Sequence, residues 1–195
     1  MSSFSLLINR EHRLPQDYVP SEMIPVPIPF DAHPKDSKRL MQKEAALAAA
    51  QLLQRARSMK IQLYGISGYR SYERQKILYE NALTRAMREH SVSREEAVPF
   101  ILVSPPGASE HQSGLALDVS SPSVALDLTE DFGRTREGRW LKAYAPLYGF
   151  ILRYPKDKVH ITGYAWEPWH IRYVTKSLAL YLSLTNLTLE EYHSI

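Results

Sequence analysis

The chain has 195 residues, of which 44% are hydrophobic and 23% charged, and a formal net charge of +3. These values are typical of one globular domain with a sizeable core, and too small for two comfortable domains. The basic residues form no dense block, so we expect no nucleic-acid partner. Because the chain has no cysteine, disulfides and thiolate metal sites are excluded, and any metal must be held by His, Asp or Glu.

No apolar run approaches the roughly 20 residues that a membrane-spanning helix needs, so we expect no transmembrane segment. Residues 1–9 lack the basic start and the long apolar run of a signal peptide. The localisation therefore stays open. The cell envelope is expected if the chain is exported or trimmed, and the cytoplasm if it is complete as given.

Residues 1–35 are predicted to form an extended arm rich in proline. The prolines between Pro15 and Pro34 forbid a helix and favour polyproline or edge conformations. Valine, isoleucine and phenylalanine lie between them, which favours an arm packed on the domain surface over a disordered tail. Residues 36–195 then form the domain itself.

The first part of this domain is predicted to be mostly helical. Apolar residues at helical spacing predict a helix over residues 36–59, capped at its start, and a short strand follows over residues 62–67. A second helix is expected over residues 71–87. A capping box of Ser93 and Glu96 opens a short third helix.

The stretch from Ser109 to Asp118 carries a histidine and a carboxylate around a small turn. Beyond Gly114, apolar and polar residues alternate, which predicts a half-buried strand over residues 115–120. This strand would carry Asp118 out of the core, towards the side that His111 faces. A catalytic zinc site has three protein ligands and one open position, so this pair would supply two of the three ligands.

The rest of the chain continues the alternation of helices and strands. In chain order, the patterns predict a loop over residues 120–129, a helix over 138–148, a strand over 150–155, a turn over 159–163, a strand over 169–174, a helix over 176–184, and a last helix opened by the capping box of Thr188 and Glu191. Together these elements indicate a single α+β domain.

The third ligand must come from the remaining histidines. Four of them lie in the arm, at a charged helix end or in the tail, and we expect them to be solvated: His12, His33, His90 and His193. His160 is a competitor. His170 is favoured because Glu167 precedes it by three residues on a backbone stiffened by proline, and that carboxylate is of the right type to deprotonate a metal-bound water. Alone, this motif is more typical of an aromatic-rich strand end with a surface glutamate and a core histidine than of a metal site.

Taken together, His111, Asp118, His170 and Glu167 supply three metal ligands and a free carboxylate as general base. Competing catalytic signatures are missing from the sequence. It has no H-E-x-x-H, S-x-x-K or G-x-S-x-G motif, no P-loop and no G-x-G-x-x-G.

Four sequence motifs resemble those of the VanY-type D-alanyl-D-alanine carboxypeptidases, which are zinc peptidases of the bacterial cell wall. They are S-G-Y-R-S at 67–71, S-E-H-Q-S-G-L-A-L-D at 109–118, G-F-I-L-R-Y-P at 149–155 and E-P-W-H-I-R-Y-V at 167–174. The resemblance implies the D,D-peptidase/hedgehog fold, with a small, mostly antiparallel sheet flanked by helices. It would make residues 36–195 the zinc peptidase catalytic domain.

The resemblance also implies a role for each site residue. His111, Asp118 and His170 would bind one Zn2+, and Glu167 would activate water and then pass the proton to the leaving amine. Arg70 would stabilise the oxyanion or hold the terminal carboxylate of the substrate, tasks that suit its fixed fork of donors. Ser109 and Gln75 would contact the substrate backbone. The implied partner is a peptidoglycan stem peptide or its precursor, and we expect a monomer.

The bond that is cut stays open at this point. Removal of the terminal D-Ala from D-Ala-D-Ala is the first hypothesis, and an L,D-carboxypeptidase acting on tetrapeptides or a D,D-dipeptidase would use the same ligands and base. We expect the pocket around Arg70 and Ser109, together with the loop over residues 120–139, to determine which of these three activities the protein has. A non-catalytic module that binds wall peptides would be expected to have lost Glu167 or a ligand, and neither is lost.

Overall fold

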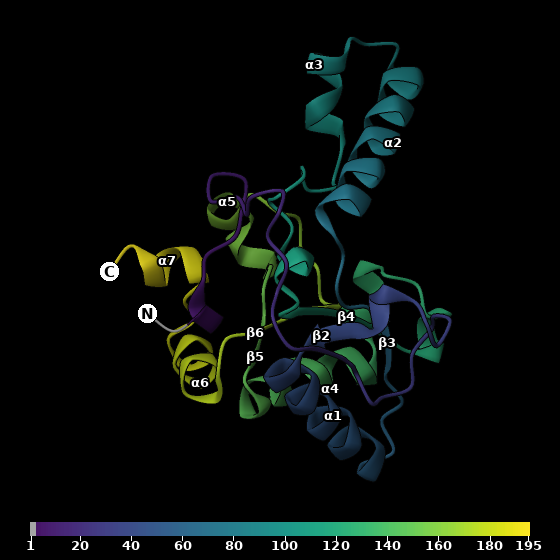
Figure 1. Cartoon of the computed structure of the whole chain (residues 1–195). Coiled ribbons are helices and arrows are strands. Elements are labelled where there is room, and N and C mark those ends of the chain that lie inside the picture. The colour runs from purple at the N-terminus through teal and green to yellow at the C-terminus, as the bar shows by residue number, and fades with distance from the viewer. Residues whose placement is uncertain (1–2) are drawn as a thin grey trace.

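The computed structural model describes residues 3–195. At its centre lies a four-stranded sheet in the order β3-β4-β6-β5, in which every neighbouring pair is antiparallel. The strands are β3 (Tyr64–Ser67), β4 (Ala116–Ser120), β5 (Phe150–Leu152) and β6 (His170–Tyr173). Helices flank this sheet, as expected for one α+β domain (Figure 1).

The helices fall into three groups around the sheet (Figure 1). One group lies against the sheet, α1 (Lys43–Ser58) with α4 (Arg136–Tyr144). A second lies near the N-terminus, α6 (Lys176–Thr185) with α7 (Leu189–His193). A third projects from the body, α2 (Tyr72–His90) with α3 (Arg94–Ala97). The short helix α5 (Val159–Thr162) occupies the segment that was expected to be a turn.

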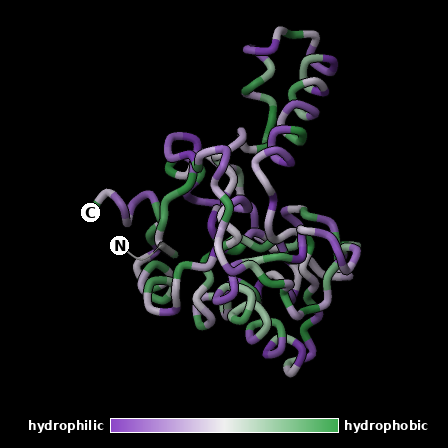
Figure 2. Tube along the Cα trace, in the orientation of Figure 1, coloured by the Kyte–Doolittle hydropathy of each residue, from purple (hydrophilic) through white to green (hydrophobic). Residues whose placement is uncertain are grey.

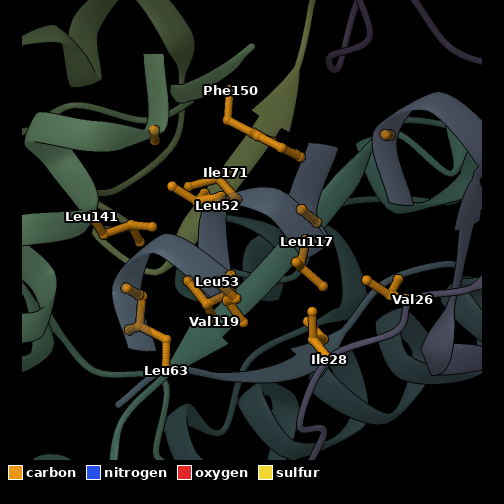
Figure 3. Packing of buried hydrophobic residues seen from close by; sticks show 14 of the residues in the cluster. Val26, Ile28, Leu52, Leu53, Leu63, Leu117, Val119, Leu141, Phe150 and Ile171 are labelled. Atoms are coloured by element: carbon orange, nitrogen blue, oxygen red, sulfur yellow. The ribbon is translucent and has the colours of Figure 1, made fainter. Parts of the chain in front are cut away.

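The core forms where α1 meets one face of the sheet. Leu52 of α1, Leu117 of β4 and Ile171 of β6 are fully buried and point towards one another (Figure 3). The other face of β4 is also closed to solvent, with Asp118 only 3% exposed. The strand predicted to be half-buried is therefore buried on both faces, because the site histidines cover its polar side.

The helix predicted from residue 36 begins seven residues later, so this boundary was wrong. Asp36 caps only a 3-10 turn over Ser37–Arg39. Residues Leu40–Gln42 form β2, which pairs with β1 (Met23–Pro25). Pairing with the arm overrides the helical pattern of these residues, and α1 starts only after the strand ends.

The arm is tied into the domain along its length. Ile8 and Val26 are buried, and the N–H of Leu14 donates to the carbonyl of Gly107 over 2.8 Å. Val26 belongs to the main core together with residues of α1 and β4. The division into an arm over residues 1–35 and a domain over residues 36–195 stays a prediction.

Helices α2 and α3 pack on each other away from the sheet. Leu83, Ala86, Ala97 and Ile101 form a small cluster of their own between them. Hydrophilic and hydrophobic residues alternate along this projecting pair (Figure 2). Ser71 caps the start of α2, and the predicted capping box of Ser93 and Glu96 is present.

Several other boundaries differ from the sequence prediction. The strand predicted over residues 62–67 begins at Tyr64, and the strand predicted over residues 150–155 ends at Leu152. The helix predicted to end at Tyr148 turns into a 3-10 segment at Ala145, next to Pro146. Among residues 3–195, no helix combines the length and apolar character that crossing a membrane requires.

Candidate metal and catalytic site

Three side chains from distant parts of the sequence converge on one buried point. Antiparallel pairing of β4 with β6 places Asp118 directly opposite His170. His111 lies on the 3-10 turn Glu110–Ser113 that precedes β4. Asp118 Oδ2 is 3.1 Å from Nε2 of His111, and Oδ1 is 2.9 Å from Nδ1 of His170. One ligand atom of each residue lies within 4.8 Å of the others.

A backbone contact fixes the orientation of the His111 ring. Nδ1 of His111 lies 2.6 Å from the carbonyl of Gly68, which can only accept, so Nδ1 carries the proton. Burial lowers the pKa of His111, which favours the neutral ring. Its Nε2 therefore turns a lone pair towards Asp118. The N–H of Arg70 donates back to the carbonyl of His111 over 3.1 Å, which joins the two motifs.

The ring of His170 is oriented by a carboxylate that the sequence interpretation had not singled out. Glu110 Oε2 is 3.3 Å from Nε2 of His170, on the side of the ring away from Asp118. A proton held at Nε2 by Glu110 leaves Nδ1 as the atom that faces the metal position. Burial lowers the pKa of His170, but its hydrogen bonds to Asp118 and Glu110 outweigh burial and raise the pKa to about 10.

Glu110 is kept ionised by two buried arginines. Its Oε1 accepts from Nε of Arg153 and from Nη1 of Arg172, each over 2.7 Å, and the three side chains are closed to solvent. Burial alone would raise the pKa of Glu110, but these guanidinium groups hold it well below its usual range. Each buried charge therefore has a partner of opposite sign, which offsets part of the cost of removing it from water.

Glu167 lies at the open side of the site. Its Oε2 is 3.9 Å from Nδ1 of His170, and its side chain keeps 23% of its surface exposed. Burial raises the pKa of Glu167 to about 7, while the charges of His170 and Arg70 act to lower it. A carboxyl group with a pKa near neutrality, beside a metal position and open to solvent, is suited to proton transfer.

Arg70 extends from the end of β3 and faces the site. Burial lowers its pKa, and the charges of Asp118 and Glu167 act in the opposite direction. Its guanidinium donates to Oε1 of Gln75 over 3.0 Å and to Oγ of Ser67 over 3.2 Å. Both partners are neutral, so its positive charge is available to a ligand.

The remaining two predicted residues are buried beside the site. Gln75 is 1% exposed, and its amide also donates to the carbonyl of Ser104 over 2.6 Å. Both ends of this amide are occupied, so Gln75 orients Arg70. Ser109 is 5% exposed and directly precedes Glu110 in the chain.

The donor set fits zinc. Two imidazole nitrogens and one carboxylate oxygen are the ligand types of catalytic zinc sites, and three protein ligands leave one position open. The ring hydrogen bonds of His111 and His170 point one nitrogen of each ring inward. Burial acts to raise the pKa of Asp118, but both histidines hold it well below its usual range, so the inner carboxylate is ionised.

The motifs match a known family over most of the chain. Residues 38–176 match the family described as VanY, D-alanyl-D-alanine carboxypeptidase. The chain belongs to this family. A relative from Bacillus subtilis (strain 168), named "Putative carboxypeptidase YodJ", is 42% identical over 186 residues, which cover 95% of this chain and 65% of that protein. The chain thus spans less than two thirds of that relative's length.

Solved structures of two peptidases share the fold. The LdcB LD-carboxypeptidase superimposes with a TM-score of 0.88 at 41% identity, over 96% of this chain and 84% of that one. A variant of the vancomycin resistance D,D-pentapeptidase VanY, in complex with Zn(II), superimposes with a TM-score of 0.77 at 28% identity, over 97% of this chain and 98% of that one. Both similarities extend well beyond the residues around the metal position.

The sequence interpretation missed the residues that support the histidines, namely Glu110, Arg153 and Arg172. A signal for them was present. Both arginines interrupt apolar strand sequences, F-I-L-R-Y and H-I-R-Y-V, and a charge in such a strand needs a buried partner. What the sequence lacked was the identity of that partner, which lies 43 residues from Arg153 and 62 from Arg172.

Proposed function

We propose that the protein is a zinc-dependent carboxypeptidase that removes the terminal D-Ala from peptidoglycan stem peptides ending in D-Ala-D-Ala. The observation that carries the proposal is the convergence of His111, Asp118 and His170 on one buried point, with Glu167 beside it. Membership of the family described as D-alanyl-D-alanine carboxypeptidase supports the reaction class. The expectation of a monomer stays a prediction.

His111 Nε2, His170 Nδ1 and a carboxylate oxygen of Asp118 would hold the zinc ion. When bound, zinc supplies a Lewis acid that polarises the scissile carbonyl and lowers the pKa of a bound water to about 7. The protein groups orient the two imidazoles so that one nitrogen of each ring points inward, through the Gly68 carbonyl for His111 and through Glu110 for His170.

Glu167 acts as the general base and then as the general acid. Its carboxylate takes the proton from the attacking water as the C–O bond forms at the scissile carbonyl. The same proton then passes to the amine nitrogen as the C–N bond breaks, so the products are a shortened peptide and free D-Ala. The pKa of about 7 suits a group that must accept and then release a proton.

Arg70 stabilises negative charge on the substrate. It serves either the oxyanion of the tetrahedral intermediate or the terminal carboxylate of the peptide, and its partners Gln75 and Ser67 fix its position. In this proposal Gln75 acts through Arg70, and Ser109 contacts the substrate backbone next to the metal position.

An L,D-carboxypeptidase that acts on tetrapeptide stems is the second candidate. It is favoured by the TM-score of 0.88 and the 41% identity to the LdcB LD-carboxypeptidase. Ligands and base would be the same, and the difference lies in the residue that precedes the scissile bond. A D,D-dipeptidase would also use this set of residues. A non-catalytic role is disfavoured because every ligand and Glu167 are present.

The deciding experiment is a digest of synthetic tri-, tetra- and pentapeptide stems by the zinc-loaded protein, followed by mass spectrometry. Loss of one D-Ala from the pentapeptide supports the first proposal, and loss from the tetrapeptide supports the second. Release of intact D-Ala-D-Ala indicates a dipeptidase. If no stem is shortened while zinc is bound, the proposed activity is wrong.

A further inference from the structure

A separate cavity adjoins Arg70 on the side of α2. Its volume is about 550 Å³, and it is bounded by the start of α2, the segment Asp36–Lys38, the end of β3 and Leu128 of the loop after β4. Figure 1 shows where α2 rises from the body next to β3. Since Arg70 lines the cavity and also faces the candidate metal site, the two spaces meet at one guanidinium group.

Positive charge dominates the wall of this cavity. Lys38, Arg70 and Arg74 line it, against the single carboxylate of Asp36 among its described lining residues. Asp36 is already engaged, because its Oδ1 accepts the backbone N–H of Lys38 over 2.9 Å. The charge of Arg74 reaches Arg70, whose pKa is lowered by burial and, to a smaller extent, by that neighbouring cation.

These cations have no direct ion-pair partner among the described residues, although the charges of Asp118 and Glu167 act on Arg70. Within residues 3–195, no ion pair joins the side chain of Lys38, Arg70 or Arg74 to a carboxylate, and the guanidinium of Arg70 donates only to neutral groups. Like charges that line one hollow repel each other unless an anion lies between them. The arginines of the Glu110 cluster differ, because each of them is paired.

Apart from Ser37 and Ser67, the other residues of the wall are apolar or aromatic. Leu78 of α2, Leu128 and Tyr69 face the same cavity. A small number of polar groups set in an apolar wall is the usual makeup of a ligand pocket. Guanidinium groups bind carboxylates through paired hydrogen bonds, and a lysine adds a point charge.

We propose that this cavity is a subsite that binds a carboxylate of the peptide substrate through Arg74 and Lys38, next to Arg70. The inference rests on the proposed peptidase function and deepens it by assigning specificity to two residues outside the metal centre. The carboxylate can come from the C-terminus of the peptide or from an acidic residue on the N-terminal side of the scissile bond.

Binding is measured by calorimetry on the zinc-loaded Glu167→Gln variant, so that the ligand is not consumed. Three synthetic pentapeptides serve as probes. The first ends in D-Ala-D-Ala and contains one glutamate, the second has glutamine in its place, and the third has a C-terminal carboxamide. We expect one of the two neutralised peptides to bind at least about tenfold more weakly than the first, as loss of a charge-assisted hydrogen bond predicts.

The pair Lys38→Gln and Arg74→Gln is then added to that background. Both substitutions leave the backbone hydrogen bonds of these residues intact. The carbonyl of Lys38 accepts from the N–H of Gly68, and the backbone N–H of Arg74 donates to Oγ of Ser71. We expect the preference for the charged peptide to disappear, and the peptide that showed the loss identifies which carboxylate is bound. Arg85→Gln, which removes an exposed cation of the same helix outside the cavity, is the matched control.

The subsite is refuted if neither neutralised peptide binds more weakly, or if the double variant keeps the preference. The proposed function fails in a different way. Absence of D-Ala release by the zinc-loaded wild-type protein, together with an intact charge preference in calorimetry, would leave the subsite in place and refute the peptidase activity.

Discussion

The carboxylate of Glu110 lies 3.3 Å from Nε2 of His170, on the opposite side of the ring from Asp118. The imidazole therefore lies between two carboxylates with different tasks. One of them faces the candidate metal position, and the other holds a proton on the outer nitrogen. Such outer partners fix the tautomer of a ligand histidine and raise its basicity as a ligand.

The first prediction concerns this outer partner. We expect Glu110→Gln to weaken zinc binding by about 10–100-fold, because the proton at Nε2 of His170 loses its charged acceptor. The same change leaves Arg153 and Arg172 without their shared carboxylate, and breaking a buried pair costs about 3–5 kcal/mol of stability. Competition with a chelator measures the zinc affinity, and urea unfolding measures the stability.

Glu190→Gln is the matched control for this variant. Glu190 binds Arg153 over 2.6 Å and 2.8 Å, but it has no contact with His170. We expect it to lower the stability and to keep the zinc affinity within a few fold of the wild type. Equal zinc affinities for both variants would mean that Glu110 has only a structural role.

The second prediction separates the general base from the metal ligands. Glu167→Gln is expected to keep zinc bound and to lower D-Ala release by at least about 10²–10⁴-fold, the usual contribution of general acid–base catalysis. Elemental analysis and an assay for free D-Ala are the two measurements. A variant with full zinc occupancy and near wild-type turnover would contradict the role assigned to Glu167.

Removal of the metal gives the third prediction. Zinc at 100 times its dissociation constant stabilises a protein by about 2.7 kcal/mol, so a chelator should lower the Tm by roughly 5–10 °C for a chain of this size. His111→Ala should abolish this zinc-dependent shift. His160→Ala should preserve it, since this histidine is exposed on α5, outside the metal-binding group. A shift that survives in His111→Ala would place the zinc elsewhere.

Both the fold class and the grouping of the three candidate ligands could be predicted from the sequence. His111, Asp118 and His170 carry their chemistry in their residue types and lie in short motifs, and antiparallel pairing of two strands brings them together. Local signals also succeeded where the causes are local, as in the capping boxes that begin at Ser93 and Thr188. Such hydrogen bonds depend on residues three positions apart.

Features that depend on distant partners were missed. Nothing near Leu40 in the sequence indicates that the arm will pair with it at Pro25, so a helical pattern was extended over a strand. The partner of Arg153 and Arg172 was equally hidden, because the carboxylate of Glu110 becomes their neighbour only once β4, β5 and β6 are assembled. A single sequence shows the need for a partner without showing its position.

The last prediction concerns Gly68, whose carbonyl orients His111. A Cβ at this position would lie 2.5 Å from the carbonyl oxygen of Leu40 and 2.8 Å from that of Lys38, so the backbone must shift in Gly68→Ala. We expect a loss of about 1–3 kcal/mol in stability, as for other overpacked sites. Zinc affinity should fall as well, because the shift moves the acceptor of the Nδ1 proton of His111.

Gly163→Ala provides the comparison. A Cβ there meets no atom within 4 Å, but the residue has a φ of +71°, so the cost is that of a left-handed alanine, about 1–2 kcal/mol. This variant should therefore lose stability and keep its zinc affinity, whereas Gly68→Ala should lose both. If chelator competition gives the same zinc affinity for the two variants, the carbonyl of Gly68 does not position His111 for the metal.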